Sequence, residues 1–203
     1  MEITAADVKT LRERTGAPMM DCKRALTTAQ GDLAEAELVL RRQGIASAAK
    51  KASRTASEGS IGAYIHAGGK LGVLVEVACE SDFVARTDEF QQLVHDVAMH
   101  IAAAGPRFLS REQVSEAVLA SEREIYRQQV QSQFANNPKP AAVVDKIVEG
   151  KLGKFFEENC LLDQHFVKDD KMTIQELVAS KIAKFGENIQ IRRYTRYKVG
   201  DEA

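Results

Sequence analysis

The hydrophobic pattern of the chain changes its period at Ser60. Before this residue, apolar side chains recur at three- and four-residue spacing, as they do along helices. After it, β-branched and aromatic residues follow a strand-like pattern over 61–66 and 71–79, with the turn signal Gly68-Gly69 between them. This order predicts a β-hairpin behind a helical N-terminal region. A chain that combines the two is expected to adopt an α+β fold.

The N-terminal region is expected to form three short helices in one bundle. Thr4 has a side chain that can cap the first helix. Pro18 fits the start of the second helix, because a residue in the first turn needs no backbone N–H donor. Asp32 with Glu35 resembles a capping box at the start of the third helix, which is expected to end at Gly44.

Two helical segments are expected after the β-hairpin. Residues 88–104 carry an apolar stripe at helical spacing, which predicts a helix that packs on the sheet and ends at Gly105. The polar stretch 110–159 has prolines near its middle and is expected to form a helical hairpin, with Ser110 and Gln113 as the capping pair at its start.

The C-terminal segment is predicted to be a helix followed by an antiparallel strand. Thr173 with Glu176 forms a capping-box pattern, and Gly186 is expected to end the helix. Side chains of the strand over 188–199 should alternate between a buried and a wet side. The buried side is expected to carry Ile189, Ile191, Tyr197 and Val199, and the wet side Arg192, Tyr194, Arg196 and Lys198.

These boundaries divide the chain into two expected domains and a linker. Residues 1–45 form the three-helix domain, and 59–203 form an antiparallel-sheet core with packed helices and the helical hairpin 110–159 inserted. The segment 46–58 is rich in Ala, Ser and Lys and has no large apolar residue, so we interpret it as a linker whose charges form a solvated face, with some helical character.

Common catalytic and nucleotide-binding motifs are missing from the sequence. It contains no G-x-x-x-x-G-K-[ST], G-x-G-x-x-G, H-E-x-x-H or G-x-S-x-G pattern. His95 and His100 are five residues apart and lie off a common helical face, so they are not expected to bind a metal. The three cysteines are widely spaced, which indicates reduced thiols. We therefore expect no cofactor, no metal, no direct nucleotide binding and no enzymatic activity.

Charge and hydropathy exclude further classes of partner. Lys and Arg number 28 against 29 Asp and Glu among 203 residues, a net charge of −1 that offers no field to attract phosphate backbones or anionic lipid. The apolar stretch 71–79 is much shorter than the roughly 20 residues that cross a bilayer. The acidic start at Glu2 is unlike a secretory signal. We expect no membrane or specific nucleic-acid partner, and a cytosolic or organelle-matrix location, with the cytoplasm as the prediction.

Exposed apolar residues at connections are the strongest candidates for a binding site. The segment 81–86 (SDFVAR) joins the predicted second strand to the long helix, so Phe83 either folds back into the core or contacts a partner. Composition alone favours the core. Met19 and Met20 begin a short helix at which both cannot face inward, so one of them is expected to be exposed.

Three segments closely resemble the signatures of bacterial-type translation elongation factor Ts. They are residues 15–26 (TGAPMMDCKRAL), 81–86 and 186–193 (GENIQIRR), in order along the whole chain. The resemblance implies a ubiquitin-associated-like (UBA-like) three-helix domain followed by an α+β core. Ser81 stands where the family usually has Thr, which keeps the capping hydroxyl. The single core repeat resembles the short form, which works as a homodimer.

The resemblance further implies a guanine-nucleotide exchange factor that promotes GDP release from elongation factor Tu. Phe83 would insert between helices of the partner's GTPase domain, Asp82 would act near its magnesium site, and His66 would perturb its phosphate loop. A non-exchanging adaptor or stabilising chaperone of the same partner is the alternative. The remaining partner-binding residues that the resemblance implies are Val84, Arg86, Met19, Met20, Lys23, Phe185 and Gly186.

Overall fold

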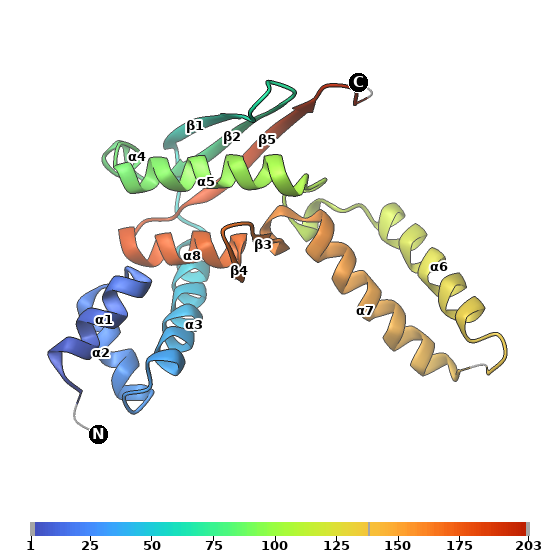
Figure 1. Ribbon diagram of the computed structural model, residues 1–203, viewed down its shortest axis with the longest axis horizontal. Coiled ribbons are helices and arrows are strands. Elements are labelled where there is room, and N and C mark those ends of the chain that lie inside the picture. The colour runs from blue at the N-terminus through green and yellow to red at the C-terminus, as the bar shows by residue number, and fades with distance from the viewer. Residues whose placement is uncertain (1–2, 138, 202–203) are drawn as a thin grey trace. The chain divides into compact units, whose positions relative to one another are not determined.

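Helices and antiparallel strands are mixed along the chain in the computed structural model, which describes residues 3–137 and 139–201 (Figure 1). The α+β fold class is confirmed. Two compact units can be separated. The first comprises Met1–Ala98 and Gln175–Ala203 and holds the N-terminal helices and a three-stranded sheet. The second, Met99–Ile174, holds a helical hairpin and a two-stranded sheet.

The N-terminal bundle contains the three predicted helices. The Thr4 hydroxyl accepts a hydrogen bond from the backbone N–H of Asp7 at 3.2 Å, and the Asp7 carboxylate accepts one from the N–H of Thr4, which completes a capping box. Asp32 caps the third helix by accepting from the N–H of Glu35 at 2.9 Å. Pro18 is the N-cap of the second helix rather than its first residue. The helices are α1 (Ala5–Thr15), α2 (Met19–Thr28) and α3 (Leu33–Lys51).

The predicted end of the third helix at Gly44 was wrong. Gly44 is buried inside α3, where a Cβ atom would lie 3.7 Å from the carbonyl oxygen of Ala179 in α8 (Ile174–Phe185). The residues that follow are mostly Ala and Lys, which are good helix formers, so the helix continues to Lys51. The Nζ of Lys51 donates to the carbonyl oxygen of Ile182 at 3.3 Å. This lysine of the predicted linker is therefore not part of a solvated face.

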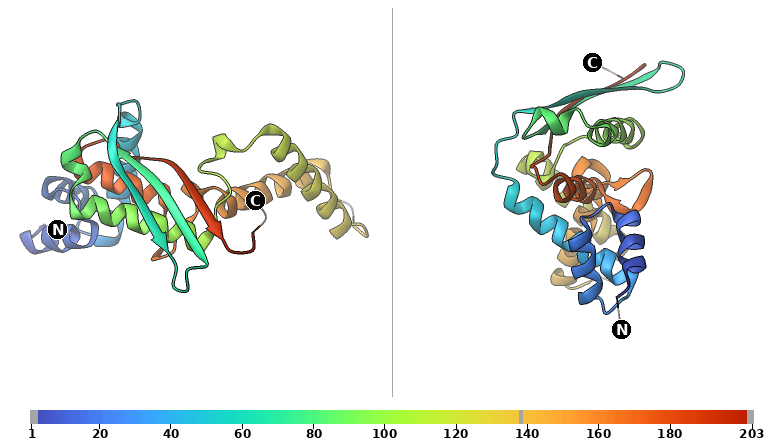
Figure 2. Two further views of the ribbon diagram at one scale, coloured as in Figure 1. Left: turned by 90° about the horizontal axis from the view of Figure 1, so that it is seen from above. Right: turned by 90° about the vertical axis from the view of Figure 1, so that its left-hand side faces the viewer.

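The core sheet has the order β1-β2-β5 and is antiparallel throughout. Gly68 and Gly69 form the hairpin turn with φ values of 92° and 69°, which glycine adopts without strain. Helix α5 (Asp88–Ala104) lies along one face of the sheet (Figure 2), and its predicted apolar stripe is buried. The strands are β1 (Glu58–Ile65), β2 (Leu71–Cys79) and β5 (Gln190–Lys198).

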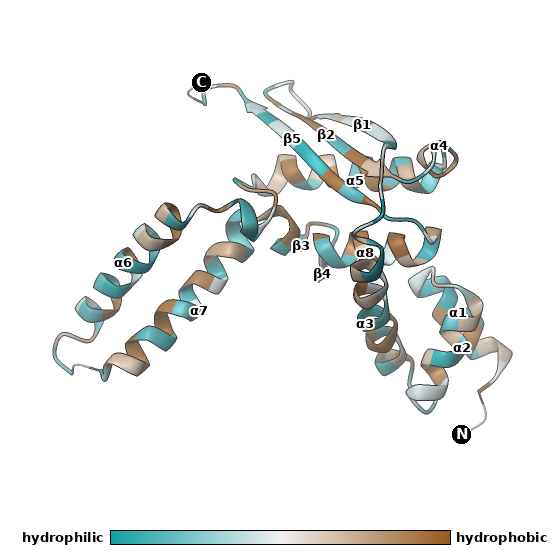
Figure 3. Ribbon diagram, turned by 180° about the vertical axis from the view of Figure 1, so that it is seen from behind, coloured by the Kyte–Doolittle hydropathy of each residue, from teal (hydrophilic) through white to brown (hydrophobic). Residues whose placement is uncertain are grey.

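A β-bulge at Arg192 changes which side chains of β5 are buried. The register against β2 shifts by one residue there, and the in-and-out alternation reverses beyond it. Ile189 and Ile191, before the bulge, are buried as predicted. Tyr197 and Val199, predicted on the buried side, are each 71% exposed. Strand β2 is mostly hydrophobic and β5 mostly hydrophilic (Figure 3).

In the second unit, α6 (Glu116–Gln133) and α7 (Ala141–Asn159) pack as the predicted helical hairpin. The predicted cap at Ser110 was wrong. Ser115 caps α6 by accepting from the N–H of Val118, and the Gln113 side chain accepts instead from the N–H of Leu109. Pro138, in the expected turn between the helices, lies outside the described residues. The unit also contains β3 (His165–Phe166), β4 (Asp169–Thr173) and the 3₁₀ turns Arg111–Gln113 and Leu161–Asp163.

The last helix, α8, has the predicted boundaries. It begins directly after Thr173 and ends before Gly186, whose φ of 76° breaks the helix. Ile174, Val178 and Ile182 recur at helical spacing on its buried face. Among the helices of the described residues, none has the length and hydropathy needed to cross a bilayer.

Candidate functional site

A single helical turn, α4 (Asp82–Ala85), connects the end of β2 to α5. Ser81 caps this turn, because its hydroxyl oxygen accepts a hydrogen bond from the N–H of Val84 at 3.3 Å. Val84 and Ala85 are buried, whereas the Phe83 ring is 79% exposed. Consecutive residues of a helix point about 100° apart, so the turn that buries Val84 directs Phe83 outward. We refer to residues 81–86 as the Phe83 corner.

The Phe83 corner also carries an exposed ion pair. The Asp82 carboxylate lies 2.9 Å from the guanidinium of Arg86, and both side chains are largely exposed. Such a surface pair contributes at most about 1 kcal/mol to folding stability. A ring that is 79% exposed contributes little core packing. Neither feature is explained by the stability of the fold, and together they make the corner the best candidate for a binding site.

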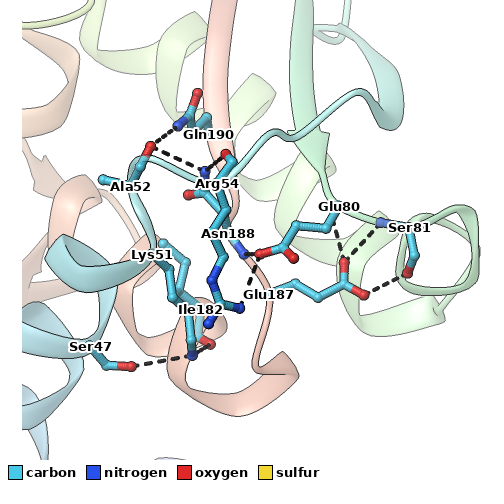
Figure 4. Close-up of polar contacts among 10 residues, drawn as sticks. All are labelled: Ser47, Lys51, Ala52, Arg54, Glu80, Ser81, Ile182, Glu187, Asn188 and Gln190. Atoms are coloured by element: carbon cyan, nitrogen blue, oxygen red, sulfur yellow. Dashed lines mark hydrogen bonds and ion pairs between the residues drawn. The ribbon is translucent and has the colours of Figure 1, made fainter.

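A carboxylate from the C-terminal part of the chain holds the Phe83 corner (Figure 4). Glu187 accepts hydrogen bonds from the backbone N–H groups of Glu80 and Ser81, and from the Ser81 hydroxyl. Sequence reasoning included Glu187 only as part of the segment 186–193 and gave it no role. Its contact with Ser81 spans 106 positions of the chain, so no local pattern could reveal it.

Phe185 and Gly186 lie next to this carboxylate in the chain. Phe185 is half-buried at the end of α8, and Gly186 is exposed. Since Glu187 binds Ser81 directly, the structure brings these two predicted site residues towards the Phe83 corner. Val84, also predicted to contact a partner, is buried in its own domain and supports the corner from within.

His66 is exposed and directly follows β1, at the hairpin end of the sheet. Its backbone N–H donates to the carbonyl oxygen of Leu71, at the start of β2, whereas the Phe83 corner follows Cys79, at the end of β2. A strand of nine residues separates the two by roughly 26 Å, at about 3.3 Å per residue. The structure therefore does not bring His66 and Phe83 into one site. The Tyr64 hydroxyl lies 3.1 Å from Nδ1 of His66.

The residues predicted on the N-terminal bundle are exposed together on α2. Met19 and Met20 are 54% and 63% exposed, so both face solvent where the sequence analysis expected one. Lys23 is exposed as well, while Cys22 and Leu26 of the same helix are buried in the bundle core. The result is a flexible apolar patch beside a positive charge, a combination that suits a protein-binding surface.

The side chains of His100 and of the three cysteines are buried and have structural environments. His100 is buried; its Nδ1 accepts from the N–H of Val167, which leaves Nε2 to donate to the Gln164 side chain at 3.1 Å. Burial lowers the pKa of His100, so it is neutral at pH 7. The three cysteines are buried and free, and burial raises the pKa of Cys160 to about 11. Across residues 3–137 and 139–201, no cluster of three or more metal-ligating side chains occurs.

Comparison with known proteins places the chain among the translation elongation factors. The family model described as Elongation factor TS matches residues 6–201. The chain is 58% identical to elongation factor Ts of Koribacter versatilis over 201 residues, which cover 99% of this chain and 90% of that protein. It is 59% identical to elongation factor Ts of Solibacter usitatus over 98% of this chain and 92% of that protein. For elongation factor Ts of Moorella thermoacetica the identity is 56%, over 98% and 96%. The chain belongs to the elongation factor Ts family.

Proposed function

We propose that this protein acts in the cytoplasm as a guanine-nucleotide exchange factor, which promotes release of GDP from the GTPase elongation factor Tu. The observation that carries the proposal is the 79% exposure of Phe83 on a turn held between a strand and a helix. The membership of the elongation factor Ts family supports the choice of partner. No chemical conversion by this chain is part of the proposal.

Exchange requires that this protein and GDP weaken each other's binding to the partner. By linkage, the two effects are equal, and about 1.4 kcal/mol of coupling corresponds to a tenfold change. A Phe side chain buries about 150–250 Å² in total. Covering the exposed 79% of it gives about 3–5 kcal/mol at ~25 cal/mol per Å², as an upper limit. One ring that enters a pocket closed by bound GDP would thus supply an effect of at most about a hundredfold to a few thousandfold.

The other exposed residues have defined roles in this proposal. Asp82 brings a carboxylate beside the ring, where it would disturb the magnesium ion that bridges the partner's bound phosphates. Arg86 pairs with Asp82 and Val84 supports the turn from the core. The docking surface is completed by Met19, Met20 and Lys23 on the bundle and by Phe185 and Gly186 beside the corner.

We also propose that the protein works as a homodimer through the outer face of its sheet. Four large apolar side chains on this face are 50–71% exposed: Ile61, Ile65, Leu74 and Tyr197. Residues around Ile65 and Tyr197 line a shallow hollow of about 360 Å³. A second copy of the chain would cover this face and would supply another His66. The positions of His66 and Phe83 support this arrangement. In one protomer they lie at opposite ends of β2, so a second copy would offer another His66 in a different place.

Stopped-flow measurement of fluorescent GDP leaving elongation factor Tu tests the exchange function. The protein is expected to accelerate release, and the acceleration should depend on Phe83. A protein that binds elongation factor Tu without accelerating release would be the alternative adaptor or stabilising chaperone.

Light scattering on the purified protein tests the proposed homodimer. A molar mass equal to that of one chain would contradict it.

A further inference from the structure

The Phe83 corner is supported from within by the buried Val84 and Ala85, and its start is held by one remote side chain. Helix α4 has only four residues, and a single helical turn is not stable by itself. We propose that Glu187 is a positioning residue for nucleotide exchange, whose carboxylate holds the corner so that Phe83 is presented in one orientation. This inference rests on the proposed exchange function, but the contact that it invokes can be tested separately.

Glu187 accepts three hydrogen bonds at the start of the Phe83 corner (Figure 4). Its Oε2 accepts from the N–H of Glu80 at 3.1 Å and from the N–H of Ser81 at 3.0 Å. Its Oε1 accepts from the Ser81 hydroxyl at 2.6 Å. Hydrogen bonds to an ionised acceptor are stronger than those between neutral groups. One carboxylate therefore immobilises both the backbone and the side chain at the start of the turn.

The Ser81 hydroxyl passes this restraint on to the turn that carries Phe83. A hydroxyl has one donor and two acceptor positions. Because its proton is directed to Glu187, its oxygen is free to accept from the N–H of Val84 as the helix cap. Loss of the carboxylate would release the hydroxyl to rotate, and the two backbone N–H groups would lose their acceptor. The start of the turn, and with it the orientation of Phe83, would then be less restrained.

A second carboxylate, that of Glu80, joins the segments 80–81 and 187–188 by accepting a hydrogen bond from the other segment. The Glu80 carboxylate accepts from the N–H of Asn188 at 2.6 Å and lies 3.6 Å from the guanidinium of Arg54. Asn188 is buried, and its side-chain amide donates to the carbonyl oxygen of Arg54 at 2.8 Å. The segments 80–81 and 187–188 thus hold each other, and both are joined to the chain between α3 and β1.

The core around the corner does not need Glu187. Cys79 at the end of β2 and Phe90 in α5 are fully buried on either side of the turn. Removal of the carboxylate should therefore free the corner while these elements stay packed. We expect the Glu187→Ala variant to fold, to bind elongation factor Tu, and to lower the maximal rate of GDP release by about tenfold or more. The concentration that gives half of this rate should change by less than about threefold.

The Glu187→Gln variant separates hydrogen bonding from charge. Its amide oxygen can accept from both backbone N–H groups, and its amide NH₂ can donate to the Ser81 hydroxyl, whose second lone pair still caps Val84. We expect this variant to keep the maximal rate within about threefold of the wild-type rate. A loss in Glu187→Gln as large as in Glu187→Ala would overturn the positioning role.

Glu89→Ala is the matched control for a general loss of stability. Glu89 is also half-buried, and its carboxylate binds Lys181 at 2.6 Å and Lys184 at 2.6–2.8 Å, away from the corner backbone. We expect this variant to lose stability in urea but to keep the maximal exchange rate. If exchange fell in both variants in proportion to their loss of stability, Glu187 would have only a structural role.

A fluorescence measurement tests the contact without the partner. The chain has no tryptophan, so Phe83→Trp places a single reporter on the corner. Adding Glu187→Ala should lower the fluorescence anisotropy of this residue, whereas Glu187→Gln and Glu89→Ala should not. An unchanged anisotropy in the Glu187→Ala protein would overturn the inference. If the wild-type protein failed to accelerate GDP release, the exchange function would be wrong, and the anisotropy would still decide whether Glu187 holds Phe83.

Discussion

Gly62 of β1 lies directly against Val94 of α5. A Cβ atom on Gly62 would come within 2.3 Å of the Val94 Cγ1 atom, well inside van der Waals contact. Val94 is 1% exposed and β-branched, so its side chain has no room to rotate away. The missing side chain of Gly62 thus lets the long helix approach the sheet closely, and α5 begins at Asp88, just beyond the Phe83 corner.

The Gly62→Ala variant is expected to be destabilised by about 1–3 kcal/mol, because the added methyl group overpacks the contact with Val94. Urea unfolding followed by circular dichroism measures this loss. Gly150→Ala is the control, since a Cβ atom at Gly150 in α7 meets nothing within 4 Å. That variant should gain up to about 1 kcal/mol from the better helix former. Equal stability changes in the two variants would contradict the close packing.

Substitution of two phenylalanines distinguishes a binding role from a structural role. Phe83→Ala should leave the free energy of unfolding nearly unchanged, because the ring is 79% exposed, and should strongly slow GDP release from elongation factor Tu. Phe90→Ala removes a fully buried ring of α5 and should cost about 3–5 kcal/mol. Unfolding curves and stopped-flow release rates on both variants test the pair. The proposed insertion of Phe83 into the partner would be contradicted if Phe83→Ala unfolded the protein while exchange per folded molecule stayed unchanged.

Local patterns predicted the elements whose ends are determined by neighbouring residues. The Thr4 cap of α1 and the glycine turn before β2 are of this kind. Gly44 resembles a helix end, but it lies inside α3 and accommodates the nearby backbone of Ala179, a contact that no local pattern contains. The bulge at Arg192 could not be predicted either. Beyond it, each side of the strand carries both an aromatic and a basic residue, so the pattern does not show which side is buried.

The candidate site could be predicted only in part. The sequence of 81–86 did not determine whether Phe83 is buried in the core or exposed. Phe83 is exposed because Val84 and Ala85 are the buried residues of the turn. The resemblance to a family supplied the candidate residues without their positions. It could not show that His66 and Phe83 lie at opposite ends of β2, or that Glu187 joins the corner from a distant part of the chain.

The three thiols are expected to be unreactive in the folded protein. Cys22, Cys79 and Cys160 have no exposed surface, and burial raises the pKa of each thiol, to about 11 for Cys160. At pH 8 the Cys160 thiol is only about 0.1% thiolate, and the thiolate is the reactive form. Ellman's reagent should therefore label the protein only in guanidinium chloride, where three thiols should react. Rapid labelling of one native thiol, or a disulfide-linked dimer on a non-reducing gel, would contradict this expectation.

Stability of the hairpin unit should fall as the pH drops below about 6.5, the ordinary pKa of histidine. Burial lowers the pKa of His100 in the folded protein, although its hydrogen bond with Gln164 opposes the shift. Between the folded pKa and 6.5 the unfolded chain binds the extra proton, so this histidine destabilises the fold as pH falls, by at most about 1.4 kcal/mol per pH unit.

Urea unfolding between pH 7.5 and 5 measures the dependence on His100. The carboxylates of Asp7 and Glu89 have pKa values lowered below their ordinary 3.8 and 4.5, so their contribution to stability is lost only at more acidic pH. His100→Gln is the control, because it removes the titrating ring and keeps a side chain that can hydrogen-bond. This variant should be less stable at pH 7.5 but flatter with pH. If the variant and the wild-type protein lost stability in parallel between pH 6.5 and 5, another group would be responsible, and His100 would not be the residue that senses pH.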